Sequence, residues 1–80
     1  MEKKRSIRQI ALEIKQVWKN VYFGAEPYLV AMLSLHSVKD KYMFEDGTTI
    51  VRYFLANAQT FRGDDAKRIK AELKELLKDA

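Results

Sequence analysis

The chain has 80 residues, of which 48% are hydrophobic and 32% are charged, and its net charge is +4. This length supports one small domain (residues 1–80), and the composition is typical of a folded protein rather than a disordered one. The sequence has no cysteine, which excludes disulfides, thiolate zinc sites and cysteine nucleophiles. No run of about twenty apolar residues occurs, so we expect no membrane span. The start of the chain is basic but lacks the pattern of a secretory signal, so we do not interpret it as one.

The first predicted element is a helix over residues 6–22. Ser6 is suited to cap it, and Gln9 stands three residues later, where it completes a capping box. The apolar residues recur at helical spacing and fall on one face: Ile7, Ile10, Ile14, Val17, Trp18 and Val21. Gly24 ends the helix, and Pro27 is suited to begin the next one.

A basic flank of this first helix is the leading candidate for partner binding. Residues 1–20 carry six basic and two acidic side chains, so the positive excess of the chain belongs to this segment. Helical phasing gathers four cations around a leucine that lies off the apolar face: Arg5, Arg8, Lys15 and Lys19, with Leu12 among them. We expect these side chains to be exposed and unpaired, and to contact an anionic partner. The alternatives are an ordinary solvated face, or ion pairs with Asp64, Glu72, Glu75 and Asp79 of an antiparallel last helix.

The second predicted helix, residues 27–38, reads PYLVAMLSLHSV and is apolar on nearly every side, as in a mostly buried element. His36 lies near its end, beside Ser34 and Ser37. This group lacks a carboxylate in the same element to orient the histidine, so we do not expect a catalytic triad. We therefore interpret His36 as a histidine at the edge of a helix.

A polar loop is predicted from residue 39 to residue 47. Tyr42 and Phe44 are apolar residues within it. They either pack inward and close the domain, or form an exposed anchor for a protein partner. The acidic residues Asp40, Glu45 and Asp46 do not have the spacing of a calcium loop. We expect no metal and no cofactor.

The third segment, residues 49–60 (TTIVRYFLANAQ), fits either a helix or a strand. Its β-branched and aromatic residues suit a strand, but strict alternation is absent and no partner strand is visible, so we favour a helix. Asn57 then falls on the inner face of that helix. A buried amide requires a partner, and a nearby backbone carbonyl or the hydroxyl of Tyr53 or Tyr28 would supply it.

The last predicted helix covers residues 63–79. Two aspartates at its start and lysines in its later turns suit the helix dipole. Its apolar stripe comprises Ala66, Ile69, Leu73, Leu76 and Leu77. Four lysines share one flank and form a candidate nucleic-acid surface: Lys67, Lys70, Lys74 and Lys78. We expect Trp18 to lie at the centre of the core with Ile14, Leu73 and Leu77 within reach.

Three stretches of the sequence, YFGA-PYL-AM, YFLANA-TFRG and RIKAEL, resemble a group of small uncharacterised proteins carried by prophages and other mobile elements of Gram-positive bacteria. The resemblance covers nearly the whole chain. It implies a cytoplasmic bacterial setting and a dispensable or accessory role, but it supplies no reaction, cofactor or catalytic residue.

Together these observations predict a compact all-α domain of four helices and a non-catalytic protein that acts by binding another protein. The alternative function is weak binding of nucleic acid, without sequence specificity, through the basic helix flanks. Self-association is left open. Salt separates the two main functions, because phosphate contacts weaken steeply with ionic strength.

Overall fold

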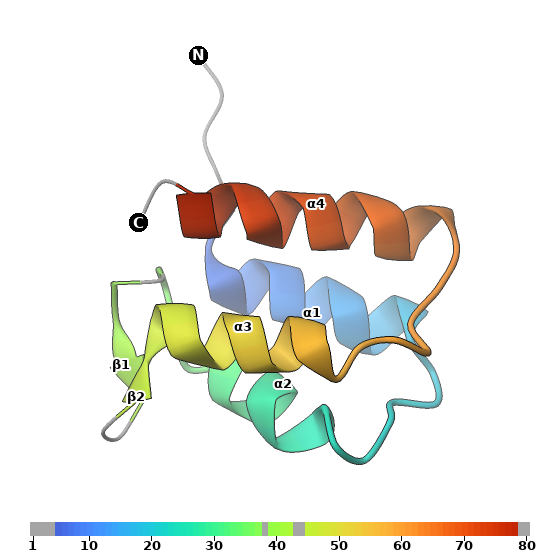
Figure 1. Ribbon diagram of the computed structural model, residues 1–80, viewed down its shortest axis with the longest axis horizontal. Helices are drawn as coiled ribbons and strands as arrows, with labels where there is room; N and C mark the ends of the chain where they lie inside the picture. Colours follow the sequence, from blue (N-terminus) through green and yellow to red (C-terminus); the bar gives the residue numbers. More distant parts are fainter. Residues whose placement is uncertain (1–4, 38, 43–44, 79–80) are drawn as a thin grey trace.

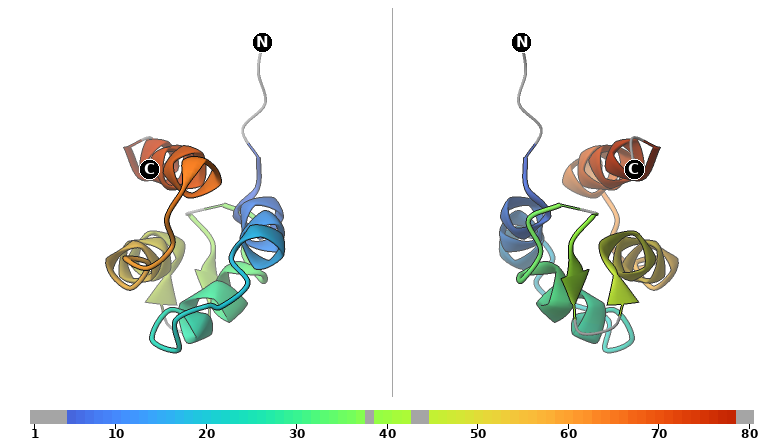
Figure 2. Two further views of the ribbon diagram at one scale, coloured as in Figure 1. Left: turned by 90° about the vertical axis from the view of Figure 1, so that its right-hand side faces the viewer. Right: turned by 90° about the vertical axis from the view of Figure 1, so that its left-hand side faces the viewer.

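A computed structural model describes residues 5–37, 39–42 and 45–78. Its helices are α1 (Ile7–Val17), α2 (Glu26–Met32), α3 (Gly47–Ala56) and α4 (Asp64–Lys78). α1 packs against α2 and α4, and α3 completes the ring by packing against the same two helices (Figures 1 and 2). The prediction of a compact all-α fold with four helices is confirmed.

α1 begins as predicted and ends early. The N–H of Gln9 donates to the Ser6 hydroxyl at 3.1 Å, and the N–H of Ser6 donates to the side-chain oxygen of Gln9 at 2.9 Å. This capping box was predicted. The helix ends at Val17 rather than at residue 22, because Trp18 takes an extended backbone conformation (φ −103°, ψ 92°). Residues 18–25 then form a loop.

α2 is also shorter than the predicted 27–38. It ends at Met32, and the chain turns through residues 33–37. The Asp40 carboxylate accepts hydrogen bonds from the N–H groups of His36 at 2.9 Å and Ser37 at 3.3 Å, which holds this turn. Where a plain loop was predicted, β1 (Lys41–Tyr42) and β2 (Glu45–Asp46) pair antiparallel as a minimal hairpin.

The third segment is a helix, as favoured, but shifted towards the N-terminus of the predicted 49–60. α3 starts at Gly47 and ends at Ala56, so Ala58 and Phe61 are buried in the connection to α4 rather than on a helix. Asn57 caps the C-terminus of α3. Its side-chain N–H donates to the backbone carbonyl of Tyr53 at 2.8 Å, one of the partners expected for this amide.

The core lies between the four helices and has an aromatic cluster at one end. Trp18 is only 6% exposed; it stacks on Phe61 at 4.9 Å between centroids and meets Phe54 edge-on at 6.1 Å. The remaining core is aliphatic. Its fully buried large side chains, besides Phe54, are Ile7, Ile10, Ile14, Met32, Leu35, Ile69, Leu73 and Val51.

The structure corrects two of the three predicted neighbours of Trp18, Leu73 and Leu77. Ile14 stays close, because the N–H of Trp18 donates to its backbone carbonyl at 2.8 Å. α4 runs antiparallel to α1 (Figure 1), and the Arg5–Glu72 ion pair places Leu73 beside the start of α1. Trp18 lies at the other end of α1, roughly 16 Å from Ile7 at a rise of 1.5 Å per residue. Helical phasing assigned the correct face to Trp18 and Leu73, but it carries no information on the direction of packing.

The two ends of the bundle differ. The hairpin, the start of α1 and the end of α4 lie at one end, and the connections 18–25 and 57–63 lie at the other (Figure 1). Over the described ranges, each helix falls short of the length and apolar character that crossing a membrane requires.

Candidate partner-binding surface

Arg5 does not belong to an unpaired basic flank. Its guanidinium forms ion pairs with Glu13 at 2.8 Å and with Glu72 at 2.5 Å, and its side chain is partly buried. The hydrogen bonds to Glu72 are the largest of the effects that raise the pKa of Arg5. The expectation that Arg5 is free is therefore wrong, and the alternative of pairing with an antiparallel last helix holds for this residue.

Glu13 lies at the centre of this ion-pair network. Its carboxylate contacts both Arg68 and Arg5. Hydrogen bonds from the two guanidinium groups, with Arg68 contributing the larger effect, hold the pKa of Glu13 below its ordinary value of 4.5. A carboxyl whose pKa is lowered by folding stabilises the protein above its unfolded pKa. This contribution is lost as the pH falls through the folded pKa.

We predict that Glu13→Gln lowers the free energy of unfolding by about 0.5–1 kcal/mol at neutral pH, the usual range for a surface network. The difference from the parent should begin to shrink as the pH falls below the ordinary pKa of 4.5, and it should disappear only once the pH has passed below the lowered pKa of the folded protein, where the parent carboxyl is protonated as well. Urea unfolding at a series of pH values measures this. Glu75→Gln, a change at an exposed glutamate of α4, is the control; an equal pH dependence in both variants would contradict the role of Glu13.

The other members of the predicted flank are exposed. Arg8, Lys15 and Lys19 all lie on the surface, and Leu12 is 44% exposed. Arg8 also donates to the backbone carbonyl of Leu33 at 2.9 Å, which ties α1 to the end of α2. Val30 of α2 is 51% exposed as well.

A cavity of about 180 Å³ continues this surface between α1 and α2. Its apolar lining comes from Trp18, Val21, Leu29 and Val30, and its charged lining from Lys15, Lys19 and Glu26. We call the cavity, together with Arg8, Leu12 and Val30, the α1–α2 groove. Its α1 side is basic and its floor is apolar, so it offers contacts to an apolar side chain that has a carboxylate beside it.

No family model, curated protein or solved structure matches the chain. The resemblance to prophage proteins therefore stays a prediction from the sequence.

The lysines of α4 are not equivalent. Lys67, Lys74 and Lys78 are exposed, whereas Lys70 is half-buried. The ammonium group of Lys70 donates to the backbone carbonyl of Phe61 at 2.7 Å and lies 5.7 Å from the centre of the Phe61 ring. Lys67 and Lys70 line one cavity with Arg62.

The loop candidates are covered only in part. Tyr42 pairs with Glu45 in the hairpin, but its side chain lies outside what the structure describes, as do residues 43–44, and with them Phe44. His36 is exposed beyond the end of α2. In the described part of the chain, no three acidic or histidine side chains gather in a way that would hold a metal ion.

Sequence reasoning missed three exposed apolar side chains. Val30 had been assigned to a mostly buried helix, and Tyr22 to the end of the first helix. Phe23 is 78% exposed and Tyr22 is 42% exposed, and their rings lie 4.9 Å apart. Gly24, which follows Tyr22 and Phe23, indicated a turn at this place. Nothing in the sequence indicated that α1 ends as early as Val17 and leaves both aromatic residues in a loop.

Proposed function

We propose that this protein is a non-catalytic binding protein whose partner is another protein, and that the α1–α2 groove is its binding site. The observation that carries the proposal is a cavity lined by the exposed Val30 together with Lys15 and Lys19. Leu12, an exposed apolar side chain of α1, adds a second apolar contact. Apolar anchors in a pocket provide most of the affinity of protein interfaces, and charges on the rim select the partner.

The groove favours a partner of a particular kind. Leu12 of α1 and Val30 of α2 are exposed apolar side chains on two helices that pack against each other, and we take them, with the apolar lining of the cavity, as an apolar strip. An amphipathic helix lays its apolar face into such a strip through side chains spaced three and four residues apart. Carboxylates on the α1 side of that helix would face Arg8, Lys15 and Lys19. We therefore infer an acidic amphipathic helix as the bound element.

We further propose that the protein has an accessory role in a bacterial phage or mobile element and acts in the cytoplasm. This part of the proposal rests on the sequence resemblance and on the expected location alone. The surface position of His36 and the structural use of Asp40 in the turn support the non-catalytic assignment.

The test is a selection of acidic amphipathic peptides against the parent protein, followed by affinity measurements on variants. Lys15→Glu with Lys19→Glu should weaken the selected peptides at least tenfold, because two attractions become repulsions. Arg8 is left in place, since its bond to Leu33 also joins two helices. Lys74→Glu with Lys78→Glu is the matched control, because it changes the net charge equally at exposed sites on α4.

Retained affinity in the control and loss in the groove variant is the expected result. Equal loss in both would show that only total charge matters, and would refute the groove as the site. A further variant, Leu12→Asp, removes the apolar anchor and should abolish binding at any salt concentration. Circular dichroism and thermal unfolding show whether each variant keeps the parent fold.

A further inference from the structure

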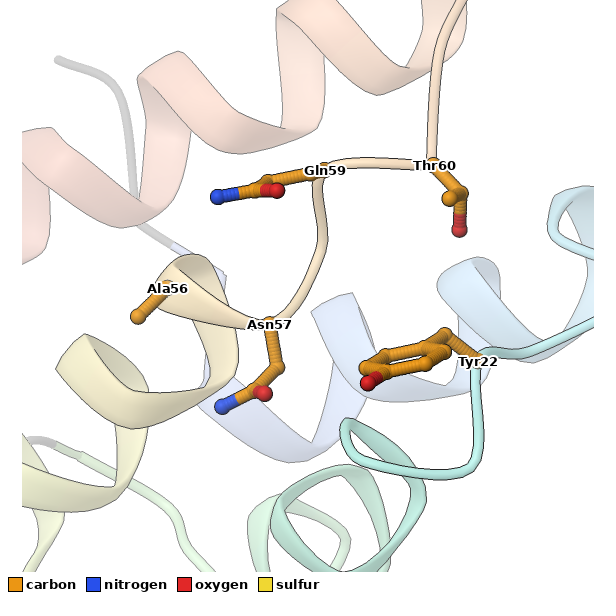
Figure 3. A pocket seen from close by; sticks show the side chains of 5 residues that line it. All are labelled: Tyr22, Ala56, Asn57, Gln59 and Thr60. Atoms are coloured by element: carbon orange, nitrogen blue, oxygen red, sulfur yellow. The ribbon is translucent and has the colours of Figure 1, made fainter.

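A second surface lies where the connections 18–25 and 57–63 meet. It begins with a cavity of about 330 Å³ that has one aromatic wall and otherwise polar or small side chains: Tyr22, Ala56, Asn57, Gln59 and Thr60. In Figure 3 the Thr60 hydroxyl points towards the Tyr22 ring, and Asn57 stands beside that ring. Within residues 5–37, 39–42 and 45–78, no Lys, Arg, Asp or Glu side chain lines this cavity.

The polar groups of this cavity offer both donors and acceptors. The Asn57 side chain donates one N–H to the Tyr53 carbonyl, which orients the amide and leaves its oxygen able to accept. That oxygen lies beside Gly24, 3.1 Å from where a Cβ at this position would be, and the Tyr22 ring lies at only 2.6 Å. The absence of a side chain at Gly24 thus lets the Tyr22 ring and the Asn57 amide both approach this position. Gln59 and Thr60 are exposed and add an amide and a hydroxyl.

An aromatic face beside amides and a hydroxyl is the chemistry that recognises an unpaired nucleobase. Proteins hold such bases by stacking them on aromatic rings and by hydrogen-bonding their edges. Phe23 adds a second aromatic face, since its ring is highly exposed and lies 4.9 Å from that of Tyr22. A carboxylate would gain no charged partner from the side chains that line the cavity.

A basic cavity of about 360 Å³ adjoins the first, and Gln59 lines both. Its cations are Arg62, Lys67 and Lys70, and no acidic side chain lines it in the part of the chain that the structure describes. Burial lowers the pKa of Lys70 below its ordinary value of 10.5, and the positive charges of Lys74 and Arg62 lower it further. The nearby Asp65 contacts Arg68, which in turn joins Glu13 of α1. This cavity is therefore suited to an anion.

We propose that the two cavities together bind single-stranded nucleic acid, with one base against Tyr22 between Asn57 and Thr60 and the adjoining phosphate at Arg62 and Lys67. An uncharged aromatic cavity adjoins a basic cavity, and Gln59 lines both. This arrangement matches a strand, in which each base is followed by a phosphate. This site differs in place and in ligand from the α1–α2 groove.

The probe is a fluorescein-labelled oligothymidylate of roughly ten nucleotides, within the site sizes usual for such proteins. Its fluorescence anisotropy is followed as the full chain is added at several salt concentrations. Tyr22→Leu should weaken binding about 5- to 150-fold, the range for loss of one base stack. Tyr53→Leu is the matched control, because Tyr53 is 50% exposed but lines neither cavity.

The phosphate contact has its own pair of variants. Arg62→Gln should weaken binding and reduce the salt slope by roughly 0.7, the value for one phosphate on a single strand. Arg52→Gln removes an exposed cation that lines neither cavity and should leave the slope nearly unchanged. Gln59→Ala, at an exposed position, should weaken binding as well and tests the site if Tyr22→Leu fails to fold.

Four outcomes would overturn the proposal. The first is that the parent does not bind the oligonucleotide, and the second is that Tyr22→Leu and Tyr53→Leu lose equal amounts of affinity. The third is that polyglutamate competes as strongly as unlabelled oligothymidylate does. The fourth is that thymidine monophosphate competes as strongly as the unlabelled strand does. The third would indicate an acidic protein as the ligand, and the fourth a free nucleotide.

Discussion

Replacing Trp18 with alanine should lower the free energy of unfolding by about 3–5 kcal/mol, the usual cost of removing a buried aromatic side chain. Trp18 has the largest side chain of the core, and it joins α1 to both Phe54 of α3 and Phe61 of the following connection. Small domains have about 5–15 kcal/mol of total stability, often near the lower end, so this loss should leave a substantial unfolded population at room temperature. Urea unfolding followed by circular dichroism measures the loss.

The matched control for this prediction is Phe23→Ala. It removes an aromatic side chain of similar kind that is mostly exposed, so its effect should stay within about 0.5 kcal/mol. If Trp18→Ala unfolds at the same urea concentration as the parent, the aromatic cluster is not the core of this end of the domain. A large effect of Phe23→Ala would show instead that Phe23 packs against the domain in solution.

The helices were predictable because their apolar faces are local patterns. The Ser6–Gln9 box marked the start of α1, and the acidic first turn marked the start of α4. The ends were harder to predict. Trp18 continues the apolar pattern of α1, so periodicity extended the predicted helix, whereas the backbone leaves the helix at this residue. The end of α2 depends on Asp40, which holds the turn through residues 36 and 37 from outside that element.

The sequence predicted which basic residues share one flank of α1, but it did not predict which of them are free of ion pairs. Phasing placed Arg5 with Arg8, Lys15 and Lys19, but a single helix contains no information on the carboxylates that face it. Glu72 reaches Arg5 only because α4 packs antiparallel to α1. The exposure of Val30, on the α2 side of the groove, was not predicted for the same reason. An apolar residue on an apolar helix gives no sign of which side of that helix remains uncovered. Pairing between helices is a tertiary property.

The buried stripe of α4 can be tested at Leu73. Leu73→Ala should lower the free energy of unfolding by about 2–5 kcal/mol, because the side chain is fully buried and its removal leaves a cavity. Leu77→Ala, four residues later on the same helix, is the control. Leu77 is only partly buried, so its truncation should cost clearly less. If the two substitutions lowered the free energy of unfolding equally, the buried stripe of α4 would not be where the structure has it.

A double-mutant cycle between Trp18 and Leu73 distinguishes the observed packing from the one that phasing alone predicts. In the antiparallel arrangement these residues lie at opposite ends of α1, so the effects of Trp18→Phe and Leu73→Ala should add within about 0.5 kcal/mol. Trp18→Phe combined with Phe61→Leu is the positive control, since these rings stack and should couple by about 0.5–3 kcal/mol. The phenylalanine substitution keeps the double variants folded enough to measure. Coupling between positions 18 and 73 as strong as that between 18 and 61 would mean that α4 runs the other way along α1, and the Arg5–Glu72 pair would then have to be absent as well.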